Sequence, residues 1–222
     1  MNLSLLAQAA LFQGMTLEEV KEMLNCLGAG QKHFAKNEVV YPVGEPVESM
    51  GFVLSGRVQI ESDDLWGNKS ILDSIAPGMV FAETYACIAD EPLLVNVTAA
   101  EPSEILFLNT RRILAACPNS CAHHSRLIQN LLAITAQKNL TLSRRIFHTS
   151  SKTIRGRLLS YLSFQSIQQN SRNFVIPFNR QQLADYLSVD RSALSNELSK
   201  MQREGILESS RNHFQLKIEV EK

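Results

Sequence analysis

The chain has 222 residues, 45% hydrophobic and 20% charged, which is enough for one large or two modest domains with their own cores. A formal net charge of zero gives no general attraction to nucleic acid. The charge is unevenly distributed, however: residues 150–222 hold 11 Lys or Arg against 7 Asp or Glu, a balance of +4 that leaves −4 for residues 1–149. The C-terminal part is therefore the part suited to bind phosphates.

The sequence offers no sign of a membrane or secreted protein. No window approaches 18 uncharged apolar residues, and residues 1–10 lack a positive segment, so they predict a first helix rather than a signal peptide. The four cysteines are too few and too scattered for a disulfide framework, and they suit a reducing compartment. We therefore expect a cytoplasmic protein that does not bind a membrane.

Residues 3–27 predict short helices, with Thr16 as a cap and two glutamates in the first turn of the second helix. From residue 32 onward, short strand-like runs alternate with turns marked by glycine, which indicates an antiparallel sandwich or a small barrel. The runs are residues 39–41, 51–54, 57–60, 70–72, 79–81, 93–99 and 105–108.

A short helix is expected to begin near residues 109–112, and a stretch without Pro or Gly then extends to Thr153. A helix of about 30 residues would be about 45 Å long, more than a small barrel can cover. Its apolar stripe is wider than a coiled-coil seam needs, so we expect it to pack on its own barrel and on a second copy as a parallel dimer. A purely intramolecular core helix is the alternative. Ser150 and Ser151 mark a hinge.

The C-terminal residues predict a helix over 153–168, a strand over 173–177 and then two short helices. Asn179 caps the first of these, Ser188 and Val189 form the turn, and Asp190 or Ser192 caps the second, which ends near Gly205. Two strands follow over residues 206–218, around a Ser-Arg-Asn turn. This arrangement is a winged helix-turn-helix, which binds DNA; an ordinary helical hairpin with a solvated polar face is the alternative.

The exposed side of the second short helix carries groups that can donate hydrogen bonds to base edges and phosphates in a major groove. These groups are Arg191, Ser192, Ser195, Asn196 and Lys200. Arg211, at the tip of the hairpin, is expected to contact a backbone phosphate.

The order of elements resembles the CRP/FNR family of bacterial transcription regulators over nearly the whole chain. Matching segments are residues 41–45, 53–58, 77–83 and 180–184. The resemblance implies an α+β fold in three parts. They are an N-terminal double-stranded β-helix, or jelly-roll-like β-roll, in residues 1–116, a long dimerisation helix in 117–149, and a winged helix-turn-helix in 150–222.

By the same resemblance, residues 190–200 are the recognition helix, where Arg191 reaches a guanine or a phosphate, and Arg180 contacts a phosphate. Ser192 and Asn196 depart from the glutamate and second arginine frequent in the family, so its familiar half-site cannot be carried over. Asn196 can pair with an adenine, which is worth roughly 1 to 3 kcal/mol of discrimination at one position.

The expected effector pocket departs from the family members that bind cyclic AMP. Those members carry a Gly-Glu-Leu segment for the ribose and an Arg-Ser or Arg-Thr pair for the phosphate. Here Glu83 is kept, but Leu93 and Leu94 replace the pair, and burying a phosphate there would cost several kcal/mol. Lys138 and Asn139 of the long helix are expected at the nucleobase position. A cation at Lys138 favours a small apolar carboxylate, unless Lys138 is simply a solvated surface lysine.

The cysteines and histidines bear on two other sensor chemistries. The iron-sulfur members need a cluster of four cysteines, and Cys26 and Cys87 are too few for it. A second motif combines Cys117 and Cys121 with His123 and His124, a spacing that suits zinc or a redox disulfide. Its structural alternative is a helix start with small buried cysteines. We predict no cofactor and no metal.

We therefore expect a homodimeric, sequence-specific transcription regulator controlled by a small effector other than cyclic AMP. The helix-turn-helix domains of the two copies, about 34 to 36 Å apart, would bind a palindromic operator on double-stranded DNA. RNA polymerase is a candidate partner. Catalysis is not expected, because the roll holds only His33 among histidines and the chain has no nucleophile motif. The remaining alternatives are a redox- or metal-responsive regulator and a ligand-sensing module that does not bind DNA.

Overall fold

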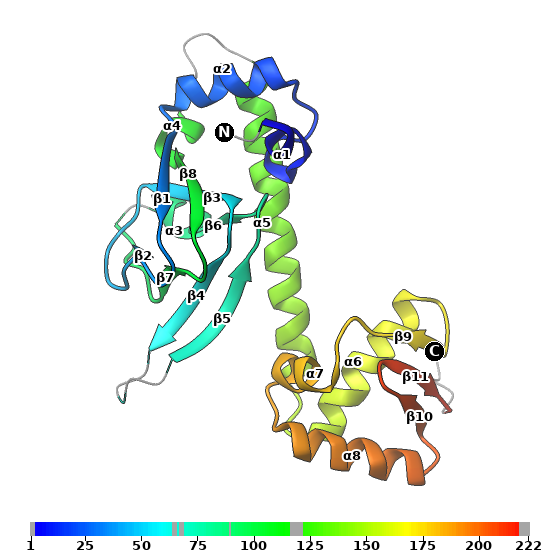
Figure 1. The fold of residues 1–222 in the computed structure, drawn as a ribbon. Coiled ribbons are helices and arrows are strands. Elements are labelled where there is room, and N and C mark those ends of the chain that lie inside the picture. Colours follow the sequence, from blue (N-terminus) through cyan, green and yellow to red (C-terminus); the bar gives the residue numbers. More distant parts are fainter. Residues whose placement is uncertain (1–2, 64–65, 67–68, 89, 116–121, 218–222) are drawn as a thin grey trace. The chain divides into compact units, whose positions relative to one another are not determined.

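The computed structural model describes residues 3–63, 66, 69–88, 90–115 and 122–217 (Figure 1). The chain forms two compact units, residues 1–137 and 138–222, whose boundary falls inside the long helix α5 (Ala122–Thr149). The expected division of function at residues 117 and 150 stays a prediction. Across the described residues, no helix combines the length and the apolar character that crossing a membrane requires.

The first unit begins with two helices, α1 (Leu3–Gln8) and α2 (Leu17–Leu27), separated by a turn of 3-10 helix, η1 (Ala10–Phe12). The predicted cap is confirmed as a capping box. The Glu19 amide donates to Thr16 Oγ1 at 3.3 Å, and the Glu19 carboxylate accepts from the Thr16 amide at 2.7 Å. This start fixes α2 with its apolar face in the core.

A β-roll of two antiparallel four-stranded sheets follows, as expected. One sheet has the order β1-β8-β3-β6 and the other β2-β7-β4-β5. The strands are β1 (Gly30–Phe34), β2 (Val39–Tyr41), β3 (Ser49–Ser55), β4 (Val58–Asp63), β5 (Lys69–Ile75), β6 (Val80–Phe81), β7 (Asn96–Ala99) and β8 (Ser103–Asn109). Strand β1 was not expected, because most of its residues are exposed and it lacks the apolar alternation of a half-buried strand.

Two short helices complete the roll. The helix α3 (Glu83–Cys87) was not expected, since a single turn is too short for a periodic pattern; it starts after Ala82, which has a left-handed backbone with φ 57°. The helix α4 (Thr110–Leu114) was expected, and Asn109 caps it by accepting the Arg112 amide at 3.0 Å.

The core of the first unit lies between the sheets and the N-terminal half of α5. Phe52 and Leu106 from the sheets are buried with Leu127 and Leu131 from α5. Asn130 of α5 also donates to the carbonyl oxygens of Leu11 and Gln13, at 3.0 and 2.9 Å. The first half of the long helix is therefore part of the roll.

The second unit contains the rest of α5 and the expected winged helix-turn-helix. After α6 (Ile154–Gln168), a three-stranded sheet of order β10-β11-β9 packs with two short helices. Its elements are β9 (Asn173–Val175), α7 (Arg180–Leu187), α8 (Arg191–Arg203), β10 (Leu207–Ser210) and β11 (His213–Leu216). Helix α5 ends at Thr149, just before the serines predicted as a hinge.

An aromatic cluster attaches the end of α5 to this domain. His148 is buried, and its ring centroid lies 5.5 Å from Tyr161, 5.1 Å from Phe164 and 6.1 Å from Tyr186. Its Nδ1 is 3.2 Å from Ser160 Oγ. The last turn of α5 is thereby held on both α6 and α7.

Candidate nucleic-acid interface

Helices α7 and α8 form the helix-turn-helix, which we call the reading head. They meet at a tight corner, and local hydrogen bonds fix the start of each helix. Asn179 Oδ1 accepts the Gln182 amide at 3.0 Å, while Gln182 Oε1 accepts the Asn179 amide at 2.9 Å. Asp190, one of the two predicted caps, accepts the Ala193 amide at 2.9 Å. Because Ser192 and this amide donate to it, the pKa of Asp190 lies below its usual value.

The corner has an apolar interior. Leu183, Ala184, Leu187, Leu194 and Leu198 are all buried. Between the helices, Ser188 adopts a left-handed backbone with φ 54°, and its amide closes α7 on the carbonyl of Asp185 at 3.2 Å. The side chains left outside on α8 are therefore held by a rigid support.

The predicted base-contacting residues lie on the outside of α8. Arg191, Ser192, Asn196 and Lys200 are exposed, and Ser195 is half-buried. The two serines already use their protons, since Ser192 donates to Asp190 and Ser195 donates to the Arg191 carbonyl at 2.9 Å. Their hydroxyls are therefore placed as acceptors, which leaves Arg191, Asn196 and Lys200 as the donors of this face.

Arg180, expected to contact a phosphate, links α7 to the wing. Its guanidinium donates to Ser209 Oγ at 3.0 Å and lies 5.0 Å from the centre of the Phe214 ring. Burial lowers the pKa of Arg180 from its usual value. Arg211 is exposed at the tip of the β10–β11 hairpin, in a left-handed conformation with φ 54°.

Arginines that the sequence analysis missed hold the helix-turn-helix from behind. Arg157 of α6 donates to the carbonyl oxygens of Leu187 and Ser188 at 3.0 and 2.9 Å. Arg145 of α5 donates to the carbonyl oxygens of Asp185 and Tyr186 at 3.0 and 3.2 Å. Both cations satisfy carbonyls at the C-terminal end of α7, where the helix dipole favours positive charge.

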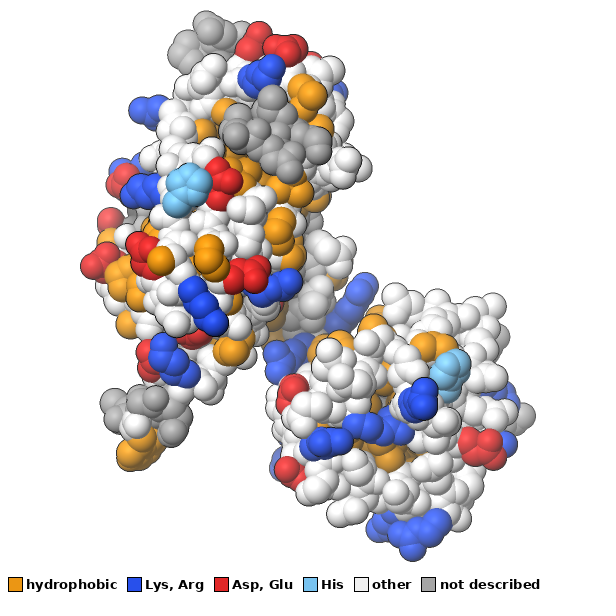
Figure 2. Space-filling view, in the orientation of Figure 1, with side chains coloured by type: hydrophobic (Ala, Val, Ile, Leu, Met, Phe, Trp, Pro, Cys, Tyr) orange, Lys and Arg blue, Asp and Glu red, His pale blue; other side chains and the backbone are white. Residues whose placement is uncertain are grey.

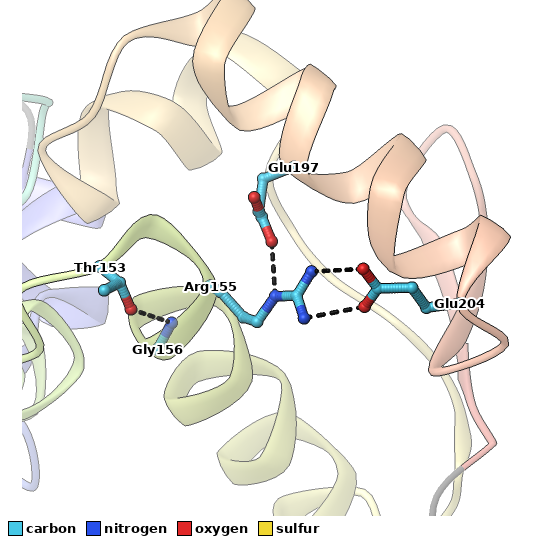
Figure 3. Close-up of polar contacts among 5 residues, drawn as sticks. All are labelled: Thr153, Arg155, Gly156, Glu197 and Glu204. Atoms are coloured by element: carbon cyan, nitrogen blue, oxygen red, sulfur yellow. Dashed lines mark hydrogen bonds and ion pairs between the residues drawn. The ribbon is translucent and has the colours of Figure 1, made fainter.

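A second arginine of α6 contacts the recognition helix. Arg155 Nε lies 2.6 Å from Glu197 Oε1, and its two terminal nitrogens lie 2.8 and 3.1 Å from the carboxylate oxygens of Glu204 (Figure 3). Nearby, Thr153 Oγ1 caps α6 by accepting the Gly156 amide at 3.0 Å (Figure 3). Sequence spacing does not predict these ion pairs, because Glu197 and Glu204 lie 42 and 49 residues after Arg155.

The unit that carries the reading head is strongly basic. Residues 138–222 hold 14 Lys or Arg against 7 Asp or Glu, a balance of +7 with histidines neutral. Figure 2 shows Lys and Arg side chains spread over the visible face of the unit, with fewer acidic side chains among them. Such a surface attracts a polyanion at long range.

Comparison with known proteins gives the same assignment. The family model described as a cyclic nucleotide-binding domain matches residues 31–120, and the one described as a Crp-like helix-turn-helix domain matches residues 156–220. The chain belongs to the CRP/FNR family of transcription regulators. No curated protein matches the sequence.

Solved structures share this fold at low sequence identity. The Thermus thermophilus catabolite activator protein matches with a TM-score of 0.51 and 19% identity over 94% of this chain and 93% of its own. CprK complexed with OCPA gives 0.61 and 16% over 90% of this chain and 92% of its own. The c-di-GMP responsive regulator CLP of Xanthomonas campestris gives 0.55 and 16% over 92% of this chain and 100% of its own.

The residues expected at the effector site of this CRP/FNR protein fall in both units. In the first unit, Glu83 and Leu93 are buried, whereas Leu94 is 70% exposed. The side chain of Leu94 therefore faces solvent, while that of Leu93 lies in the core. In the second unit, Lys138 is half-buried and Asn139 is exposed, with Asn139 Oδ1 accepting from Ser143 Oγ at 3.2 Å. Effector binding by these residues stays a prediction.

The predicted zinc or redox motif falls partly outside the described residues, which do not include Cys117 and Cys121. His123 Nδ1 lies 3.3 Å from Glu19 Oε1, and His124 Nε2 lies 3.0 Å from the Arg112 carbonyl oxygen. Among the residues that the structure describes, no three His, Cys, Asp or Glu side chains are grouped to hold a metal ion. A sensing role for this motif stays a prediction.

Proposed function

We propose that two copies of this CRP/FNR protein pair through α5 and read a palindromic operator on double-stranded DNA with α8, under the control of a small effector other than cyclic AMP. The observation that carries the DNA-reading role is the outer face of α8. It presents Arg191, Asn196 and Lys200 as donors on a rigid, capped corner. The basic unit around it supplies the attraction to phosphate.

The donors on α8 divide the work of recognition. Arg191, at the first position of the helix, suits a guanine edge or a phosphate, and Lys200 suits a phosphate. Asn196 suits an adenine, because its amide can donate to N7 and accept from the N6 amino group of that base. Arg180 and Arg211 would fix the register of the domain on the backbone.

The apolar surface of α5 supports pairing of two copies. Several large side chains of this helix are exposed in the single chain: Leu132, Leu140, Leu142, Ile146 and Phe147. Such a row on one helix is unusual for a monomer and fits a helix-helix interface. Two copies joined there would place their reading heads about one turn of DNA apart, roughly 34 to 36 Å. RNA polymerase remains a candidate partner at the promoter.

The chemistry of the effector follows from Leu93, the residue that replaces the arginine of the cyclic AMP-binding members. Leu93 is 1% exposed and belongs to the apolar core of the roll. A phosphate charge placed against it would lose its hydration without gaining a cation at this position. Among proteins of this fold, CprK is complexed with OCPA and CLP is responsive to c-di-GMP, so the fold does not dictate one effector.

Fluorescence anisotropy tests the DNA-reading role. We expect salt-dependent binding of the reduced protein to DNA from upstream of its own gene, with a log-log slope of about −0.9 per phosphate contact. Asn196→Ala should cost roughly 1 to 3 kcal/mol on the operator and little on unrelated DNA. The matched control is Asn25→Ala, an exposed asparagine of α2 in the first unit. Absence of DNA binding even at low salt would contradict the proposed function.

Sedimentation velocity tests the pairing. Leu142→Glu places a charge in the exposed row of α5 and should convert dimer to monomer, with weaker operator binding as a result. Ile167→Glu is the matched control, because Ile167 is also an exposed apolar residue and lies on α6. A dimer that survives Leu142→Glu unchanged contradicts the use of this face. Addition of cyclic AMP should leave the anisotropy of all variants unchanged.

A further inference from the structure

Arg155 and one of its two partners, Glu204, stand where their own helices disfavour their charges. Arg155 is the second residue of α6, after the cap Thr153, where the positive end of the helix dipole repels a cation. Glu204 is the C-terminal cap of α8, where the negative end of the dipole repels an anion. Each placement is unfavourable within its own helix and becomes favourable only when α6 and α8 meet.

The contact between the helices uses nearly the whole guanidinium. Two nitrogens of Arg155 bind the two oxygens of Glu204 in parallel, and Nε binds Glu197 at 2.6 Å (Figure 3). The side chains are one fifth to two fifths exposed, so the group lies at the edge of the protein and not in its core. The hydrogen bonds from Arg155 lower the pKa of Glu204 and keep this carboxylate ionised.

The two carboxylates lie close to the face of α8 that would approach DNA. Glu197 precedes Lys200 by about one helical turn, and Glu204 follows it by about one turn, so both are helical neighbours of this cation. Residues 190–204 hold three cations, Arg191, Lys200 and Arg203, against three carboxylates including Asp190. Without a neutralising partner for the two glutamates, this segment would be neutral and would offer no net attraction to phosphate.

We propose that Arg155 is a positioning residue for DNA binding: it holds α8 on α6 and neutralises Glu197 and Glu204, so that the recognition helix meets the phosphates with a net positive charge. The inference rests on the proposed function, in which α8 faces DNA. Repulsion between these carboxylates and the phosphates would act within the screening length of about 10 Å at moderate salt. Arg155 itself need not touch the DNA.

The test compares a variant that leaves the two glutamates without Arg155 with a variant that also removes their charges. Binding is measured on a random-sequence duplex of about 30 base pairs, because binding to such DNA is almost entirely electrostatic. Arg155→Met leaves two unpaired carboxylates and should weaken binding roughly tenfold at low salt, with a smaller loss at higher salt. The triple variant Arg155→Met, Glu197→Gln, Glu204→Gln removes those carboxylates as well and should return to near wild-type affinity. Circular dichroism checks that both variants are folded.

Each outcome decides the inference. If the triple variant binds as weakly as Arg155→Met, the arginine acts by touching DNA or by geometry alone, and neutralisation is wrong. If Arg155→Met binds like the wild type, the whole role of Arg155 is wrong. If Arg155→Met does not fold, the variant Glu197→Gln, Glu204→Gln replaces it. It should bind the duplex several-fold more tightly than the wild type, and unchanged binding overturns the proposal. If the wild type fails to bind DNA, the proposed function falls together with this inference.

Discussion

The two units of the chain carry opposite charge, −7 for residues 1–137 and +7 for residues 138–222 with histidines neutral. The sequence alone suggested only −4 and +4, because we placed the boundary after the long helix. The structural boundary inside α5 assigns Lys138, Arg144 and Arg145 to the second unit. A neutral protein can therefore contain a strongly basic DNA-binding part, and net charge informs about partners only when it is counted unit by unit.

The units also differ in how their polar groups are used. In the first unit, α5 is held by buried leucines and by Asn130, and the expected effector residues Glu83 and Leu93 lie inside. In the second unit, arginines satisfy backbone carbonyls and leave the outer face of α8 exposed. A surface that binds a polyanion needs rigid support from behind, and cations at a helix C-terminus provide it.

The largest expected effect on stability comes from removing a buried leucine from one of the two cores. Leu162→Ala removes a fully buried side chain from the second unit and should cost about 2 to 5 kcal/mol there. Leu106→Ala is the counterpart in the first unit. Hydrogen exchange measured by mass spectrometry should show faster opening only in the unit that carries the substitution. Equal acceleration of hydrogen exchange in both units would contradict the existence of two separate cores.

Next in size is the loss of Arg157. Arg157→Met leaves the carbonyls of Leu187, Ser188 and Ser151 without their donor, at a cost of about 2 to 3 kcal/mol in the second unit. Arg172→Met removes the same charge from an exposed position and should cost little. Urea unfolding followed by circular dichroism measures both. A larger loss of stability for Arg172→Met than for Arg157→Met would show that net charge, and not the hydrogen bonds of Arg157, supports the helix-turn-helix.

The two capping boxes allow a matched pair of substitutions. Thr16→Ala and Asn179→Ala each remove one cap and should each cost about 1 kcal/mol. Only Asn179→Ala should also weaken DNA binding, because only its helix supports α8. Thermal unfolding and anisotropy measured on the same samples test this. Loss of DNA binding in Thr16→Ala would contradict a division of roles between the units.

The smallest effect concerns pH. Burial, with repulsion from Arg144, lowers the pKa of His148 below its ordinary value of 6.5. The unfolded chain then binds a proton at higher pH than the folded one. The free energy of unfolding should therefore fall as the pH drops through about 6.5 toward the lowered pKa. His148→Phe should flatten this dependence, while His213→Phe, at an exposed position, should not. Identical pH profiles for the two variants would contradict the prediction.

Short-range chemistry made much of this protein predictable. The caps Thr16, Asn179 and Asp190 act on amides three residues away, and the apolar spacing of α7 and α8 appears within one or two turns. The outer residues of α8 follow from the same spacing. Strand β1 and helix α3 were missed, because an exposed edge strand and a single helical turn leave no periodic pattern.

Apart from β1 and α3, the sequence by itself determined the order of elements, together with the family and the side of α8 that points outward, because these follow from short-range patterns along the chain. Only the tertiary structure decided how the reading head is supported. Arg145, Arg155 and Arg157 act on groups 30 to 49 residues away, and Leu93 and Leu94 separate into buried and exposed although they are adjacent. Such roles depend on which surfaces meet when the helices and sheets pack. A local sequence pattern does not show which residues far apart in the chain will come into contact.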